Sequence, residues 1–159
     1  MTLNIALTET TRGDLDTLFL FQLDEEAIRL AAFTPKNPGD KYAYIEKYAK
    51  HLADPTIHMR TIKAGGEIVG SIAKFLMYDE AEITYWIDKR FWGKGIATTA
   101  LKDFLKIELA RPVSGRVAFD NYGSQKVLKN CGFVKIGNDK GFANARHTEI
   151  EEYIYKLSK

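Results

Sequence analysis

The feature that most constrains this chain is a strand, a glycine-containing turn and a helix in direct succession, from Glu82 to Leu105. Polar and apolar side chains alternate over residues 82–87 as in a half-buried strand, and apolar residues at helical spacing follow the turn. The turn itself reads Trp92-Gly93-Lys94-Gly95-Ile96-Ala97-Thr98. Glycine lets the backbone approach a ligand closely, and the first N–H groups of the helix point toward that ligand. An anion is therefore the expected occupant of this turn.

The spacing within the turn excludes two common phosphate-binding loops. A Walker loop requires Gly-x-x-x-x-Gly-Lys-Ser/Thr, which the sequence lacks. The dinucleotide fingerprint Gly-x-Gly-x-x-Gly fails because Thr98 stands three residues after Gly95. An ordinary tight turn before an amphipathic helix is the alternative that this segment alone leaves open.

The turn resembles the acyl-CoA pyrophosphate loop of the GNAT acetyltransferases, whose pattern is Arg/Gln-x-x-Gly-x-Gly/Ala. That pattern falls on Trp92, Gly95 and Ala97, with Trp92 as the departure. The form Phe-Trp-Gly-Lys-Gly-Ile-Ala-Thr is similar to the ribosomal-protein (Rim-type) N-acetyltransferase branch. Downstream, Asn121-Tyr122-Gly123-Ser124 leads to Gly132-Phe133, which resembles the family's Asn-x-x-Ser/Ala…Gly-Phe segment. Two motifs in this order and at this separation favour the family over an ordinary turn.

Length and charge limit the class of protein. A chain of 159 residues with 45% hydrophobic residues is expected to form one domain, residues 1–159. Its 23 basic and 21 acidic residues leave a formal charge of +2, which favours neither nucleic acid nor a membrane as partner. The single Cys131 and three scattered histidines offer no disulfide and no metal-ligand spacing, so we expect no metal. The first residues lack a secretory signal, which indicates a cytoplasmic protein.

The order of expected elements agrees with the GNAT α/β fold. The patterns predict strands over residues 3–8, 56–63, 67–78, 82–87, 113–119, 133–136 and 149–157, with helices over 14–23, 24–33 and 41–52, after the glycine turn, and from Asn121. Gly137, Gly141 and Asn144 are expected in a loop between the last two strands. The resemblance implies a single-domain GNAT fold, with a mixed central sheet of about six to seven strands flanked by helices and acyl-CoA bound at a splayed strand pair.

The resemblance also implies acetyl-CoA as cosubstrate. Its diphosphate would meet the turn and the positive end of the helix dipole, at Trp92, Gly93, Lys94, Gly95, Ile96, Ala97 and Thr98. Its pantetheine arm would bind the open edge of the preceding strand, as an added strand would, at Tyr85, Trp86 and Ile87. In the family, the residues matching Asn121 and Ser124 also contact the arm and its sulfur.

Two residues are candidates for catalysis. Glu82 stands in Ala81-Glu82-Ile83-x-Tyr85-Trp86, which resembles the Ala-Glu-Ile-Gly-Tyr-Trp of the Rim-type branch, and could act as general base. The alternative for Glu82 is a solvated carboxylate paired with a Lys or Arg. Ser124 could protonate the leaving thiolate, because the Tyr that many family members use falls on Leu128 here. Helix capping alone would also explain Asn121 and Ser124.

The expected reaction is acetyl transfer to a primary amine by direct attack in a ternary complex. An α-amino group, with a pKa of about 7.7–8.0, is partly neutral at pH 7, whereas lysine, at about 10.4, needs more help. A site with one plausible carboxylate therefore suits a protein or peptide N-terminus, or a small amine. A non-catalytic acyl-CoA-binding module of the same fold is the alternative function. A monomer and a homodimer are both compatible with the sequence.

Overall fold

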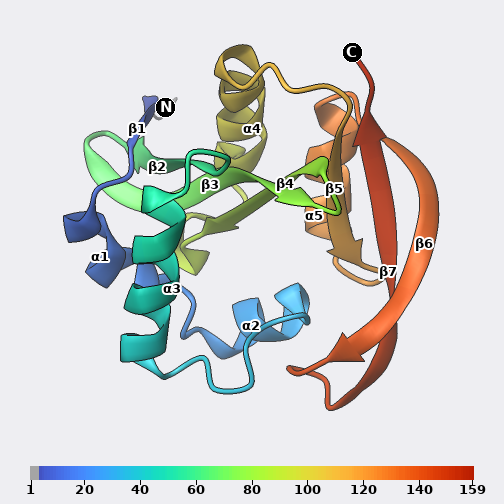
Figure 1. Ribbon diagram of the computed structural model, residues 1–159, viewed down its shortest axis with the longest axis horizontal. Coiled ribbons are helices and arrows are strands. Elements are labelled where there is room, and N and C mark those ends of the chain that lie inside the picture. Colours follow the sequence, from blue (N-terminus) through green and yellow to red (C-terminus); the bar gives the residue numbers. More distant parts are fainter. Residues whose placement is uncertain (1–3) are drawn as a thin grey trace.

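The computed structural model describes residues 4–159. In chain order, the elements are β1 (Ile5–Glu9), the 3-10 helix η1 (Arg12–Asp14), α1 (Leu15–Phe21), α2 (Glu25–Ala31), α3 (Lys41–Ala53), β2 (His58–Ala64), β3 (Glu67–Met77), β4 (Glu80–Ile87), the 3-10 helix η2 (Lys89–Phe91), α4 (Ile96–Ile107), β5 (Val113–Ala118), α5 (Tyr122–Asn130), β6 (Val134–Ala143) and β7 (Thr148–Leu157). The seven strands form one sheet in the order β1-β2-β3-β4-β5-β7-β6 (Figure 1).

The predicted order of strands and helices is confirmed, with one error near the C-terminus. Gly137 and Gly141 lie inside β6 rather than in a loop, because β6 pairs with β7 as far as Ala143 opposite Thr148. A register shift between Lys135 and Gly137 accommodates one extra residue, and glycine is tolerated at such bulges. Leu3, the first residue of the predicted N-terminal strand, lies outside the described residues.

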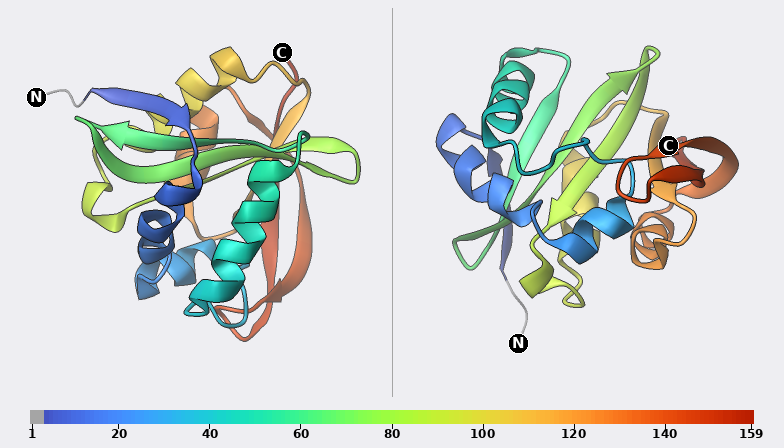
Figure 2. Two further views of the ribbon diagram at one scale, coloured as in Figure 1. Left: turned by 60° about the vertical axis from the view of Figure 1, so that its left-hand side comes forward. Right: turned by 90° about the horizontal axis from the view of Figure 1, so that it is seen from below.

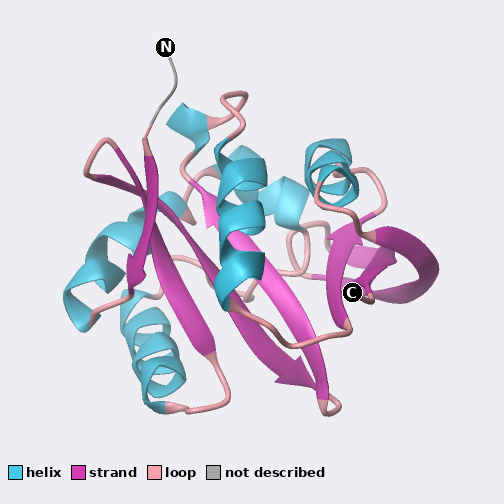
Figure 3. Cartoon of the chain, turned by 90° about the horizontal axis from the view of Figure 1, so that it is seen from above, coloured by secondary structure: helices cyan, strands magenta, loops and turns pink. Residues whose placement is uncertain are grey.

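Helices pack on both faces of the sheet. One apolar cluster joins α4 and α5 to the strands and includes Leu101, Phe104 and Leu128. A second joins α1 and α3 to the opposite face and includes Leu15 and Tyr44. In the view from above, α4 lies across the strands (Figure 3). The view from below shows α2 beside α5 (Figure 2, right panel).

The splayed strand pair expected from the resemblance lies at the centre of the sheet. β4 and β5 run parallel and pair only at Ala81–Val113, Glu82–Ser114 and Ile83–Gly115. On its other side β4 pairs with β3 as far as Ile87 opposite Gly70. The second half of β4 therefore has one paired edge and one edge that β5 leaves open.

The close approach of α5 to β5 fixes where the start of α5 lies. A Cβ atom on Gly115 would stand 2.8 Å from Leu128 Cδ2, so glycine lets Leu128 pack this closely on the strand without a shift. Asn121 begins α5 as an N-cap, since its Oδ1 accepts a hydrogen bond from the Ser124 N–H at 3.2 Å. Ser124 is thereby held beside the part of β4 that β5 leaves open.

Candidate active site

A cavity of about 680 Å³ lies where the open edge of β4 meets the N-terminal ends of α4 and α5. It extends to α2, which forms the opposite wall. Its lining residues come from these four helices and strands and from the turns before α4 and α5: Ala27, Leu30, Ala31, Tyr85, Trp86, Ile87, Phe91, Trp92, Gly93, Gly95, Ile96, Ala97, Thr98, Asp120, Asn121, Tyr122, Gly123, Ser124, Lys126, Val127 and Asn130. Of the cofactor-binding residues predicted from the sequence, only Lys94 does not line this cavity; it is exposed on the turn.

The turn before α4 presents backbone N–H groups to the cavity. Gly93 and Gly95 have φ angles of 78° and 75°, in the left-handed region that glycine enters without strain. Gly95 is the N-cap of α4, and among residues 4–159 no side chain caps this helix. The N–H groups of its first turn have no preceding helical carbonyl to bond. Together with the helix dipole they make a site for an anion.

Trp92 has a structural role that its sequence position alone does not reveal. Its indole Nε1 donates a hydrogen bond of 2.9 Å to the carbonyl oxygen of Ile87, the last residue of β4. The side chain therefore fastens the turn to the end of the strand. An Arg or Gln at this position would offer its donors to phosphate, whereas Trp92 offers the cavity an apolar face.

Asn121 ties α5 to α2. Its Oδ1 caps α5, and its Nδ2 donates a hydrogen bond of 3.2 Å to the carbonyl oxygen of Leu30. Both ends of the amide are thus engaged within the protein. The β6–β7 hairpin supports the same wall, because Arg146 Nε donates to the Arg29 carbonyl at 2.8 Å and its guanidinium pairs with Asp120.

Glu82 lies beside the cavity but does not line it. It is buried, and its Oε1 lies 3.3 Å from Arg116 Nε on β5. Burial raises the pKa of the Glu82 carboxyl above its ordinary value, and the nearby Arg116 guanidinium offsets part of that rise. The alternative of a carboxylate paired with a basic residue is therefore realised, although the pair is buried rather than solvated.

Two further charged residues join this pair. Arg116 Nη1 lies 3.2 Å from Glu152 Oε1 on β7 and 3.5 Å from Asp139 Oδ2 on β6. Burial also raises the pKa of the Glu152 carboxyl, with Arg116 again opposing the rise. Three carboxylates around one guanidinium leave this part of the site net acidic. Arg116 and Glu152 could not be identified from local sequence, because their proximity to Glu82 depends on the pairing of strands far apart in the chain.

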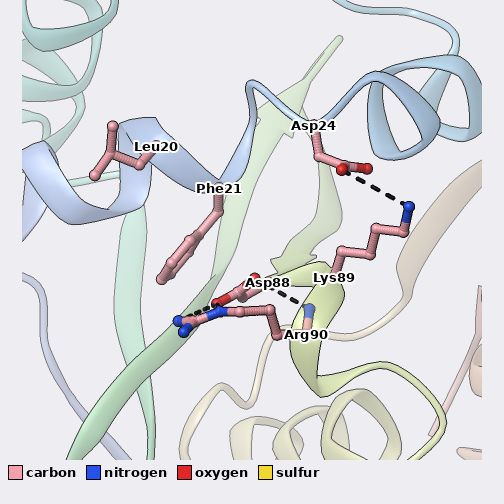
Figure 4. Close-up of a pocket in the computed structure, with 6 residues that line it drawn as sticks. All are labelled: Leu20, Phe21, Asp24, Asp88, Lys89 and Arg90. Carbon is pink, nitrogen blue, oxygen red and sulfur yellow. Dashed lines mark hydrogen bonds and ion pairs between the residues drawn. The ribbon is translucent and has the colours of Figure 1, made fainter.

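A second cavity, of about 540 Å³, lies between the end of α1, the start of α2 and η2 (Figure 4). The residues that line it are Leu20, Phe21, Asp24, Asp88, Lys89 and Arg90. Its charges neutralise one another, since Lys89 Nζ lies 3.8 Å from Asp24 Oδ1 and Arg90 Nη2 lies 2.7 Å from Asp88 Oδ2. The first cavity, with its unbonded helix N–H groups and open strand edge, is the better candidate for an anionic ligand.

Within residues 4–159, no group of three or more His, Cys, Asp or Glu side chains is arranged to hold a metal ion. No helix in the same range is long and apolar enough to cross a membrane.

The fold and the cavity together define an α/β protein with a cavity between the open edge of a strand and two helix N-termini. Residues 4–134 match the family described as "Acetyltransferase (GNAT) domain". The chain therefore belongs to the GNAT acetyltransferase family, as the two sequence motifs predicted.

Two sequence relatives are named as N-acetyltransferases. The chain is 30% identical over 135 residues to "Putative ribosomal N-acetyltransferase YdaF" of Bacillus subtilis, a match covering 76% of this chain and 73% of that protein. It is also 30% identical over 107 residues to "Uncharacterized N-acetyltransferase p20" of Bacillus licheniformis, covering 62% of this chain. The latter match spans 59% of p20, which is less than two thirds of that protein.

Solved structures share the fold at low sequence identity. RimL, the ribosomal L7/L12 alpha-N-protein acetyltransferase in complex with coenzyme A, aligns with a TM-score of 0.85 at 17% identity, covering 97% of this chain and 93% of RimL. Spermidine N-acetyltransferase from Vibrio cholerae, in complex with CoA and spermine, aligns with a TM-score of 0.77 at 21% identity, covering 96% of this chain and 95% of the spermidine enzyme. The predicted GNAT fold, with its mixed sheet flanked by helices, is confirmed.

Proposed function

We propose that this protein transfers the acetyl group of acetyl-CoA to a primary amine, with the α-amino group of a protein or peptide as the preferred acceptor. The observation that carries the proposal is that two surfaces of one cavity complement two different parts of acetyl-CoA. The open edge of β4 can bond the amides of pantetheine, and the first turn of α4 can bind the diphosphate. Family membership and the names of both sequence relatives support it.

In this proposal, acetyl-CoA runs from the α4 turn along β4 toward α5. The diphosphate binds the N–H groups of residues 93–98, and the pantetheine amides bind the backbone of residues 85–87. The thioester then lies near Ser124, at the inner end of the cavity. Asn121 supports this end by holding α5 against α2; to bond the ligand directly, its Nδ2 would have to release the Leu30 carbonyl.

The acceptor amine enters beside Glu82, on the acidic side of the splay. Because Glu82 is buried and outside the cavity lining, it accepts the amine proton through a bound water rather than by direct contact. Glu152 and Asp139 add to the negative potential that attracts a cationic amine. Arg116 keeps this carboxylate cluster together and favours the ionised form of Glu82.

The choice of a protein N-terminus as acceptor has two supports. An α-amino group needs less help to lose its proton than a lysine does. YdaF and RimL bear names that refer to ribosomal proteins. A polyamine is the second candidate, because the carboxylates around Arg116 would also attract a small polycation, and the spermidine enzyme shares the fold.

The experiment that tests the proposal measures CoA thiol release from acetyl-CoA in the presence of different amines. The panel contains peptides with free N-termini, the same peptides with blocked N-termini and an internal lysine, and spermidine. We expect fastest release with free N-termini and a loss of about 10²–10⁴-fold in kcat for Glu82→Gln. If the protein binds acetyl-CoA but no amine in the panel leads to thiol release, the result would instead indicate a non-catalytic acyl-CoA-binding module.

A further inference from the structure

Tyr85 and Ser124 form a hydroxyl pair inside the cavity, although they come from different elements. The Tyr85 hydroxyl lies 2.6 Å from Ser124 Oγ, which is a strong O–H···O distance. Tyr85 stands on β4, in the half that β5 leaves open, and Ser124 stands in the first turn of α5. Both residues line the cavity in which acetyl-CoA is proposed to bind.

The acceptors near the Tyr85 hydroxyl bear on whether the Ser124 hydroxyl can bond a ligand. Both acceptors within bonding distance of the Tyr85 hydroxyl belong to Ser124: its Oγ at 2.6 Å and its carbonyl oxygen at 3.4 Å. The phenol hydrogen is therefore directed at Ser124. Either hydroxyl can donate in the 2.6 Å bond; in the arrangement in which Tyr85 donates to Ser124 Oγ, the serine's own hydrogen is free to bond an acceptor in the cavity.

Ser124 is immobilised from two sides. Its backbone N–H donates to Asn121 Oδ1 at 3.2 Å, and its side-chain hydroxyl is hydrogen-bonded to the Tyr85 hydroxyl at 2.6 Å. Burial raises the pKa of Tyr85 to about 12, with the bond to Ser124 opposing the rise, so the phenol keeps its hydrogen at neutral pH. A serine hydroxyl fixed in this way loses little entropy when it bonds a ligand atom.

We propose that Tyr85 is a positioning residue that orients the Ser124 hydroxyl as a hydrogen-bond donor to the sulfur of departing CoA. The inference rests on the proposed acetyl transfer. In that reaction the amine nitrogen bonds to the acetyl carbon, and the carbon–sulfur bond breaks with its electron pair going to sulfur. The amine loses one proton and the sulfur gains one, so the reaction needs no further reactant. The Ser124 hydrogen bond stabilises the negative charge that develops on sulfur.

The test compares Tyr85→Phe, Ser124→Ala and the double variant in steady-state transfer assays. Tyr85→Phe should lower kcat by about 10- to 100-fold while leaving KM for acetyl-CoA within about twofold, because the lost interaction acts only as the sulfur leaves. The double variant should be no slower than Ser124→Ala, since Tyr85 acts through Ser124. Tyr42→Phe, which removes an exposed hydroxyl on α3, serves as the matched control and should behave as wild type.

A second measurement separates this role from a merely structural one. With acetyl-seleno-CoA as donor, the leaving group is a weaker base and needs less stabilisation, so Tyr85→Phe should approach the wild-type rate. Equal slowing with both donors, or additive effects in the double variant, would overturn the proposal for Tyr85. If wild-type protein transfers acetyl but Tyr85→Phe is equally fast, only this inference fails. If wild type transfers acetyl to no amine, the proposed function fails and this inference fails with it.

Discussion

At the scale of single residues, Glu82 combines a buried carboxyl with a cation that favours its ionised form. As a general base it must be ionised, so activity should fall as the pH drops through the raised pKa of Glu82. We expect kcat, measured at saturating acceptor so that the ionisation of the free amine does not contribute, to fall at low pH with an apparent pKa above the ordinary value of glutamate. A pH–rate profile of the wild type measures this apparent pKa.

Arg116 influences the pH at which activity is lost, because its positive charge lowers the pKa of Glu82. Replacing Arg116 with Gln removes this charge, so the apparent pKa should move to a higher value. Arg116→Lys keeps the charge and should leave the apparent pKa close to that of the wild type. An apparent pKa that Arg116→Gln does not move would exclude Glu82 as the titrating base.

Some residue roles could be predicted from local sequence, and others could not. Capping is the alternative to ligand contact that the local sequence allows for Asn121, because Asn at a helix start bonds the N–H three residues on, and the structure contains this bond. The bond of Trp92 to Ile87 was not expected, since a motif gives no information on where an indole points. The Glu82–Arg116 pair depends on strand register, which the local pattern does not determine.

At the scale of elements, the contact between β5 and α5 controls the shape of the cavity. Gly115→Ala would place a methyl group 2.8 Å from Leu128 Cδ2, so Leu128 of α5 would have to shift. We expect a loss of about 1–3 kcal/mol in the free energy of unfolding, together with weaker acetyl-CoA binding, because Ser124 moves with α5. Urea unfolding and calorimetry measure the two effects.

A second substitution tests the cause of this loss. Leu128→Val shortens the clashing side chain, so the double variant should be more stable than the sum of the single effects predicts, by about 0.5 kcal/mol or more. Gly123→Ala is the control for the unfolding measurement alone, because Gly123 lines the cavity; a Cβ there meets no atom within 4 Å, and Ala favours the helix over Gly. Strict additivity of Gly115→Ala and Leu128→Val would contradict a steric origin.

The strands and helices themselves were largely predictable, because each follows from a local apolar period. The strand over residues 82–87 and the helix after the glycine turn are both present. The length of β6 was not predictable from its glycines. Those residues suggest a loop locally, but pairing with β7 satisfies the backbone of Gly137 and Gly141.

At the scale of the whole molecule, the cavity joins segments that are distant in sequence. The end of β4, the turn before α4 and the start of α5 form one side, and α2 forms the other. The two motifs predicted the first side, since they resemble a known loop and a known helix start. Nothing in the sequence of α2 indicated that Ala27, Leu30 and Ala31 would face them, because that contact depends on the Asn121 bond to Leu30 and on Arg146.

The central claim is that the turn before α4 binds the diphosphate of acetyl-CoA. Calorimetric titration of acetyl-CoA, with CoA and ATP for comparison, tests it on wild type, Gly95→Glu and Gly66→Glu. Both variants place the same charged side chain at a positive φ, 75° and 86°, but Gly66 lies in the β2–β3 hairpin, outside the cavity lining. We expect wild type to bind acetyl-CoA and CoA but little ATP, Gly95→Glu to lose this binding and Gly66→Glu to retain it. Absence of binding by folded wild type, or equal binding by Gly95→Glu, would contradict the claim.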